Sequence, residues 1–110
     1  MEYGLKENVI QRIQAVLANF PEIEEAILYG SRAKGTYKNG SDIDLTFKGK
    51  NLTLLIVGKV DEQLDDLLLP YTFDLSIYHQ INNPDFLDHI NRVGQLFFSK
   101  KTETDFFPKQ

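Results

Sequence analysis

The chain has 110 residues, of which 42% are hydrophobic and 25% are charged, and its formal net charge is −4. This length and composition suit a single globular domain spanning residues 1–110, which excludes disorder as the default interpretation. The acidic balance provides no basic surface for direct binding of nucleic acid, and the absence of cysteine excludes disulfides and thiolate metal sites.

No stretch of the sequence resembles a targeting or membrane-spanning segment. Residues 1–6 lack the charged and then apolar pattern of a signal peptide. The longest mainly apolar run, from Leu52 to Val57, is far shorter than the roughly 20 residues that span a bilayer. We therefore expect a cytoplasmic protein with no membrane partner.

Hydrophobic periodicity predicts helices that alternate with strands along the chain. Helices are predicted at residues 5–19, 31–36, 53–69 and from Asn83 onward, with Phe97 on the apolar stripe of the last one. Strands are predicted at residues 23–29, 42–48 and 72–78. The order predicts an α/β (α+β) fold with a small mixed sheet and helices on one face.

Two acidic residues share one face of the second predicted strand. Asp42 and Asp44 are two residues apart, so both side chains leave the strand on the same side. Asp74 lies on the polar face of the next strand, and three carboxylates would meet if those strands were neighbours. Such carboxylates repel unless a cation lies between them, and their oxygens suit Mg²⁺ or Mn²⁺. This set predicts a two-metal site for phosphoryl transfer, whereas the simpler alternative is an exposed face with scattered acids.

A glycine and a serine lie where the first strand ends and a short helix begins. Gly30 lets the backbone approach a ligand closely, and Ser31 at a helix start adds a donor for phosphate. Ser31 as an ordinary helix cap is the alternative. Arg32 can neutralise phosphate charge, whereas Lys34 fits a solvated basic face.

These motifs resemble the polymerase β-type nucleotidyltransferase superfamily. They are the run from Gly30 to Gly35, the run from Gly40 to Leu45 that contains both acids, and Phe73-Asp74-Leu75. Ser31 and Asp42 are eleven residues apart, and the resemblance covers residues ~23 to 80. Within the superfamily the chain resembles the minimal nucleotidyltransferases, the MNT family.

The resemblance implies a role for each motif residue. Gly30 and Ser31 would bind the phosphates of a nucleoside triphosphate, with support from Arg32. Asp42, Asp44 and Asp74 would be the catalytic metal ligands for two Mg²⁺ ions, with Mn²⁺ as a substitute. The implied reaction is transfer of AMP from the substrate ATP to a hydroxyl.

The resemblance also implies a partner. MNT proteins are commonly paired with a helical HEPN-domain toxin, and the implied activity is that of an antitoxin attaching AMP to a tyrosine of that toxin. Phe97, Phe98, Phe106 and Phe107 fit either a partner surface or, for the first two, packing on the core. The alternative is a slow or non-catalytic nucleotide-binding antitoxin that acts by forming a complex.

Overall fold

The structure is a computed structural model that describes residues 2–100. Its helices are α1 (Glu7–Leu17), α2 (Ser31–Lys34), α3 (Leu54–Asp65) and α4 (Pro84–Val93), with a 3₁₀ turn η1 (Tyr78–Gln80). Its strands are β1 (Glu25–Tyr29), β2 (Ile43–Lys48), β3 (Phe73–Ile77) and β4 (Gln95–Ser99). No helix within residues 2–100 is long and apolar enough to cross a membrane.

The four strands form one mixed sheet in the order β3-β2-β1-β4. β1 is antiparallel to both β2 and β4, whereas β2 and β3 are parallel and are joined through α3. The predicted mixed sheet is therefore confirmed, and so is the expectation that the two acidic strands are neighbours. This order places β1 and β2 at the centre of the sheet.

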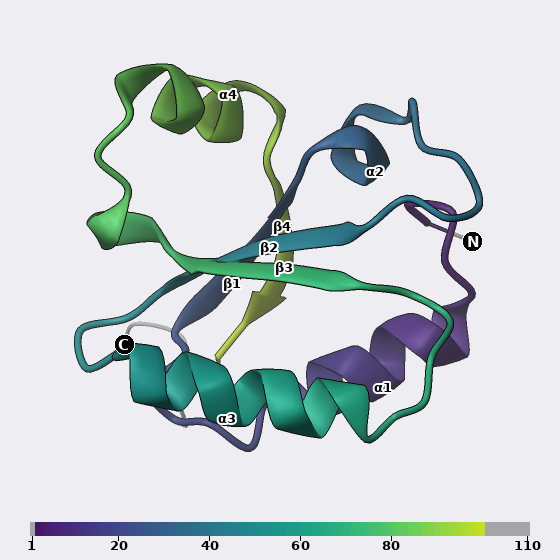
Figure 1. The fold of residues 1–110 in the computed structure, drawn as a ribbon, viewed down its shortest axis with the longest axis horizontal. Helices are drawn as coiled ribbons and strands as arrows, with labels where there is room; N and C mark the ends of the chain where they lie inside the picture. Colours follow the sequence, from purple (N-terminus) through teal and green to yellow (C-terminus); the bar gives the residue numbers. More distant parts are fainter. Residues whose placement is uncertain (1, 101–110) are drawn as a thin grey trace, which may run out of the picture.

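Helices α1 and α3 lie together on one face of the sheet, and α2 and α4 lie towards the other (Figure 1). The prediction of helices on one face therefore holds for α1 and α3 but not for α2 and α4. The apolar residues of the alternating strands pack against α1 and α3. The fully buried hydrophobic residues of this core are Leu5, Ile13, Leu17, Ile23, Ala26, Leu28, Ile43, Leu45, Phe47 and Val60. The acids of β2 and β3 belong to the opposite face, because strand side chains alternate between faces. One face of the sheet therefore provides the core and the other carries the polar site.

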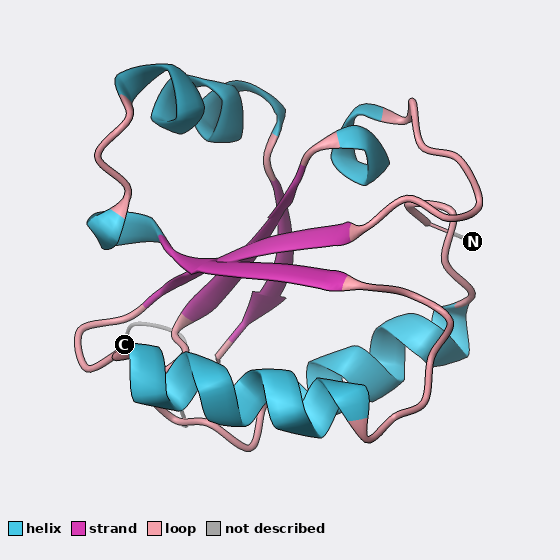
Figure 2. Ribbon diagram, in the orientation of Figure 1, coloured by secondary structure: helices cyan, strands magenta, loops and turns pink. Residues whose placement is uncertain are grey.

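The last predicted helix was wrong at its C-terminal end. α4 ends at Val93, and residues 95–99 form strand β4 (Figure 2). Gly94 leaves the helical region at φ −62° and ψ 143°, and the Leu96-Phe97-Phe98 run after it favours a strand. Phe97 is 4% exposed and belongs to the core, and Phe98 packs against it, whereas Phe106 and Phe107 lie outside the described residues.

Thr53→Ala should lower the free energy of unfolding by about 1 kcal/mol. Thr53 is the N-cap of α3, and its hydroxyl accepts a hydrogen bond from the Ile56 amide at 3.2 Å. Without it, that amide loses its partner at the exposed start of the helix. Urea denaturation measures the change, with Thr53→Ser as the control that keeps the hydroxyl. Equal stability of Thr53→Ala and the wild type would contradict the assigned cap.

Candidate active site

The turn between β1 and α2 depends on glycine. Gly30 has φ 76° and ψ −157°, a backbone conformation that is essentially restricted to glycine. Ser31 follows as the first residue of α2, a single turn that ends at Gly35 with φ 82°. The two glycines thus make a sharp turn possible at the end of a central strand, with Ser31 at its start.

Gly30 also lies directly against the carboxylate of Asp44. A Cβ atom added to Gly30 would overlap Asp44 Oδ2. The contact arises because Tyr29, the residue before Gly30, pairs with Asp44 across β1 and β2. The absence of a side chain at residue 30 therefore lets the predicted phosphate-binding turn and the predicted metal-binding strand touch.

The structure brings Asp44 and Asp74 to matched positions on neighbouring strands. They are register partners in the parallel pair β2–β3, and Asp42 lies one residue before β2. Burial first, and then the negative charges of Asp74 and Asp42, raise the pKa of Asp44 to about 6, although Arg32 acts in the opposite direction. Asp74 and Asp42 therefore lie close enough to Asp44 for their charges to act on it.

The donor chemistry of these acids fits a divalent cation. Within residues 2–100, the ion pair present joins Arg92 to Asp88 on α4, so none of the three acids has a salt-bridge partner there. The same described residues contain no group of three acidic, histidine or cysteine side chains already gathered around a metal position. The three acids supply hard oxygen donors and unbalanced negative charge, which is what Mg²⁺ requires, but they do not form a ready-made cage.

Asp44→Asn should raise the melting temperature at about pH 7.5 without divalent cations, and the gain should disappear near pH 4. The folded protein holds the Asp44 pKa at about 6, above the ordinary value of 3.8. It therefore binds more protons than the unfolded chain between these values, and stability falls as the pH rises through this window. Asparagine cannot ionise, so it removes the loss of stability that ionisation of Asp44 causes. Calorimetry at both pH values measures the melting temperatures of the variant and the wild type.

Asp65→Asn is the matched control, because Asp65 is exposed at the end of α3. A gain for Asp44→Asn of equal size at both pH values would contradict the proposed cause.

Tyr29 lies beside the acids and packs under α4. Its ring is 6% exposed and lies 5.3 Å from the Phe86 ring and 6.3 Å from the His89 ring, in edge-on arrangements. Burial is the main reason that the pKa of Tyr29 is raised to about 12; the nearby Ser76 hydroxyl lowers it, and the charges of Asp74 and Asp44 raise it. Its hydroxyl therefore stays protonated next to the carboxylates.

Two hydroxyl side chains on the acidic face were not singled out by the sequence analysis. Thr46 and Ser76 are register partners two residues after Asp44 and Asp74, and neither hydroxyl oxygen has a hydrogen-bond partner within the described residues. Thr46 is fully buried. Each hydroxyl residue lies two positions after an acid on the same strand, so it shares the face of that acid. This pattern in the sequence could have identified both residues.

Arg32 makes contacts that differ from the sequence expectation. Its side chain is 2% exposed, and its three guanidinium nitrogens donate hydrogen bonds to backbone carbonyls. A direct contact of Arg32 with phosphate stays a prediction. The hydrogen bonds from its guanidinium nitrogens to backbone carbonyls do not favour such a contact. Lys34, two residues later, is exposed as expected.

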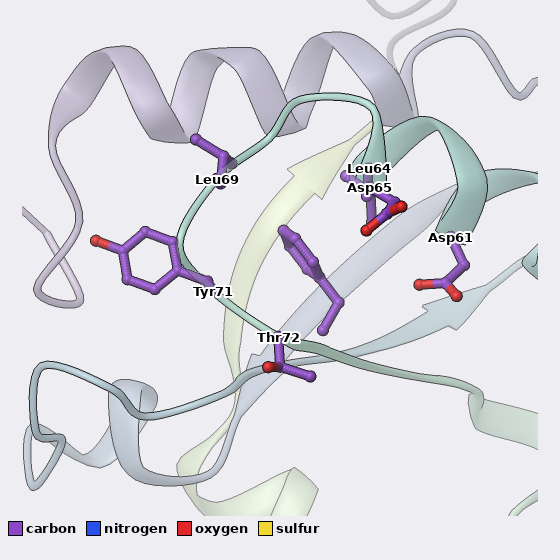
Figure 3. Close-up of a pocket in the computed structure, with 7 residues that line it drawn as sticks. Asp61, Leu64, Asp65, Leu69, Tyr71 and Thr72 are labelled. Carbon is purple, nitrogen blue, oxygen red and sulfur yellow. The ribbon is translucent and has the colours of Figure 1, made fainter.

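A cavity of about 280 Å³ lies on the other side of β3, next to α3 (Figure 3). Its lining residues are Asp61, Leu64, Asp65, Leu69, Tyr71, Thr72 and Phe73. None of the three predicted metal ligands lines it. The candidate site is therefore the open acidic face around Gly30, Asp44 and Asp74 rather than this cavity.

Solved structures with a similar fold come from toxin–antitoxin complexes. One is a toxin–antitoxin with AMP-PNP, with a TM-score of 0.65 and 22% identity over 92% of this chain and 77% of that chain. Another is a tri-AMPylated Shewanella oneidensis HEPN toxin in complex with MNT antitoxin, with a TM-score of 0.63 and 15% identity over 87% and 74%. A toxin–antitoxin MntA-HepT gives a TM-score of 0.61 and 17% identity over 91% and 77%. At these identities the likeness shows the fold.

No curated protein sequence matches the chain. A family model does match it. The model described as polymerase beta, nucleotidyltransferase, aligns with residues 11–103, which include the Gly30–Ser31 turn and all three acids. This match covers most of the chain and confirms the superfamily resemblance drawn from the motifs. The chain therefore belongs to the polymerase beta nucleotidyltransferase family.

Proposed function

We propose that this protein is a metal-dependent nucleotidyltransferase that moves AMP from ATP to a hydroxyl of a partner protein. The observation that carries the proposal is the contact of Gly30 with Asp44, together with the pairing of Asp44 with Asp74. These contacts put a turn suited to phosphate beside paired carboxylates suited to cations. This combination matches a reaction in which a charged triphosphate is held and attacked.

We assign the triphosphate to the turn at the end of β1. Gly30 has no side chain to block an approaching phosphate, and Ser31 supplies a hydroxyl and a backbone amide at the start of α2. Asp42, Asp44 and Asp74 would hold the divalent cations, which when bound neutralise phosphate charge and polarise the reacting phosphorus. The turn at Gly30 and Ser31 would therefore bind the phosphates, and the three acids would bind the cations.

In the proposed reaction, the acceptor oxygen forms a bond to the α-phosphorus of ATP. The bond from that phosphorus to the oxygen bridging to the β-phosphate breaks, and pyrophosphate leaves. The hydroxyl that receives AMP gives up its proton. The exposed carboxylate of Asp74 on the acidic face takes this proton. Tyr29, whose pKa is raised to about 12, stays protonated and does not compete for that proton.

We infer that the acceptor is a tyrosine of a HEPN-domain toxin and that the protein acts as its antitoxin. The similar fold in a complex of an AMPylated HEPN toxin with an MNT antitoxin supports a HEPN toxin as the acceptor protein. The similar fold in a toxin–antitoxin with AMP-PNP supports an adenine nucleotide as the donor. The open acidic face also leaves room for a partner segment to reach Asp74, which is on the edge strand β3.

The experiment incubates the purified chain with its helical partner, Mg²⁺ and ATP labelled either at the α- or at the γ-phosphate. Transfer of AMP predicts that the α label is retained on the partner and that the γ label is lost as pyrophosphate. EDTA should prevent labelling. Absence of both labels from the partner would contradict the proposal, and retention of the γ label would indicate a phosphate transferase instead.

A further inference from the structure

Arg32 is a buried cation that forms no salt bridge within the described residues. Its Nε donates to the Ser41 carbonyl at 3.1 Å, its Nη1 to the Tyr3 carbonyl at 2.9 Å and its Nη2 to the Asn39 carbonyl at 3.3 Å. A charged side chain that is 2% exposed is stable only when its donors are satisfied. These three carbonyls satisfy one donor on each of the three guanidinium nitrogens, out of five N–H donors in all.

Two tyrosine rings complete the surroundings of this guanidinium. Its central carbon lies 4.9 Å from the centre of the Tyr71 ring and 5.4 Å from the centre of the Tyr37 ring. Arginine over an aromatic face within about 6 Å is attracted by the ring's electrons. The side chain is therefore enclosed by rings as well as by carbonyls, and at 2% exposure it offers almost no surface to a triphosphate.

These contacts connect the segments that carry the three parts of the candidate site. Arg32 itself follows Ser31 in α2, and the carbonyls of Asn39 and Ser41 belong to the turn that leads into Asp42. Tyr71 lies three residues before Asp74, just before β3 begins. One guanidinium thus joins the start of the phosphate turn, the approach to the first acid and the approach to the third.

We propose that Arg32 is a positioning residue that sets the phosphate turn and the carboxylates in register, and that it does not itself contact phosphate. This inference rests on the proposed nucleotidyl transfer. Asp42 lies outside the hydrogen-bonded strand, so the turn at residues 38–41 determines where its carboxylate lies. That turn is closed by Ser41, whose amide donates to the Lys38 carbonyl at 3.0 Å and whose hydroxyl accepts from the Lys38 amide at 2.8 Å.

Lysine cannot replace arginine in this arrangement. Its ammonium group keeps the charge but lacks the planar fork that bonds three separate carbonyls while lying near two rings. Arg32→Lys should therefore release the turn, and a displacement of about 1 Å at a reacting group can cost about 100-fold in rate. A phosphate-binding cation would behave differently, because a lysine at the same position would still attract phosphate.

The test measures kcat and KM for ATP in the transfer reaction with the full chain and its partner. We expect Arg32→Lys to lower kcat by about 10–100-fold and to leave KM for ATP unchanged. Lys34→Gln is the comparison, since it alters an exposed cation two residues away on the same helix. A rise in KM for ATP with kcat preserved in Arg32→Lys would overturn the proposal and assign the residue to the phosphates.

Amide hydrogen exchange gives a readout that does not depend on transfer. We expect faster exchange over residues 38–42 in Arg32→Lys, with protection of β1 and of the rest of β2 preserved. Unchanged exchange over residues 38–42 would overturn the positioning role even if activity were lost. If the wild type transfers no nucleotide, this measurement still tests the role of Arg32. It therefore distinguishes failure of the proposed transfer reaction from failure of the proposed positioning role.

A second pair of variants keeps the test valid if Arg32→Lys does not fold. Tyr71→Phe retains the ring face and should match the wild type, whereas Tyr71→Leu removes one ring from the guanidinium. We expect faster exchange over residues 38–42 in Tyr71→Leu alone. Equal exchange in both variants would overturn the proposed link between Tyr71, Arg32 and the turn.

Discussion

Asp42→Asn combined with Asp44→Asn should lower the rate of AMP transfer by at least about 10³-fold. The two carboxylates supply most of the negative charge that a cation would balance beside the phosphate turn. Asparagine keeps the shape of each side chain and removes its charge, so cation binding should fail while the fold persists. The initial rate of label transfer from ATP to the partner measures the effect.

The control for this double variant is Asp65→Asn with Asp66→Asn. Both residues are exposed at the end of α3, so the pair removes the same charge away from the acidic face. We expect transfer at the wild-type rate. Equal rates for the Asp42–Asp44 variant and this control would contradict the assigned metal ligands. Neutralisation of the partner in cells by the inactive variant would favour the alternative, an antitoxin that acts by complex formation.

Gly30→Ala should lower the free energy of unfolding by about 1–3 kcal/mol and the transfer rate by about 100-fold. The new methyl group would need the space that Asp44 Oδ2 occupies, and the backbone at φ 76° disfavours any side chain. Relief of this clash moves either the phosphate turn or the carboxylate. Urea denaturation and the transfer assay measure the two losses.

Two other glycines separate the causes of the Gly30 effect. Gly35 also has a positive φ of 82°, but an added Cβ would meet nothing within 4 Å. Gly40 has open space and no positive φ. We expect Gly35→Ala to lose stability through its backbone while transfer persists, and Gly40→Ala to match the wild type. Similar transfer by Gly30→Ala and Gly35→Ala would contradict the importance of the Gly30–Asp44 contact.

Most of the fold could be predicted because its elements have strong patterns. The alternation around Asp44 and Asp74 identifies β2 and β3, and the apolar spacing of residues 5–19 identifies α1. β4 was missed because the helical stripe of α4 continues by chance onto Phe97, so periodicity alone could not find the break. The backbone of Gly94 and pairing with β1 settle that segment, and both depend on tertiary structure.

The candidate site could be predicted only as separate parts. The residues of the phosphate turn and the acids follow from motif spacing, but the pairing of Asp44 with Asp74 depends on strand order. The contacts of Arg32 could not be predicted, because they come from Tyr3, Asn39, Ser41 and two tyrosine rings at other places in the chain. In the sequence, Arg32 lies beside a phosphate motif and therefore suggests a contact with the ligand. In the fold, its side chain contacts the protein instead.

The mass of the intact partner protein, measured after incubation with this chain, ATP and Mg²⁺, tests the central claim most directly. We predict an increase by one or more AMP units, located on tyrosine, that requires both Asp42 and Asp44. An unchanged partner mass, in a sample where the two proteins form a complex in the presence of ATP and Mg²⁺, would contradict the account.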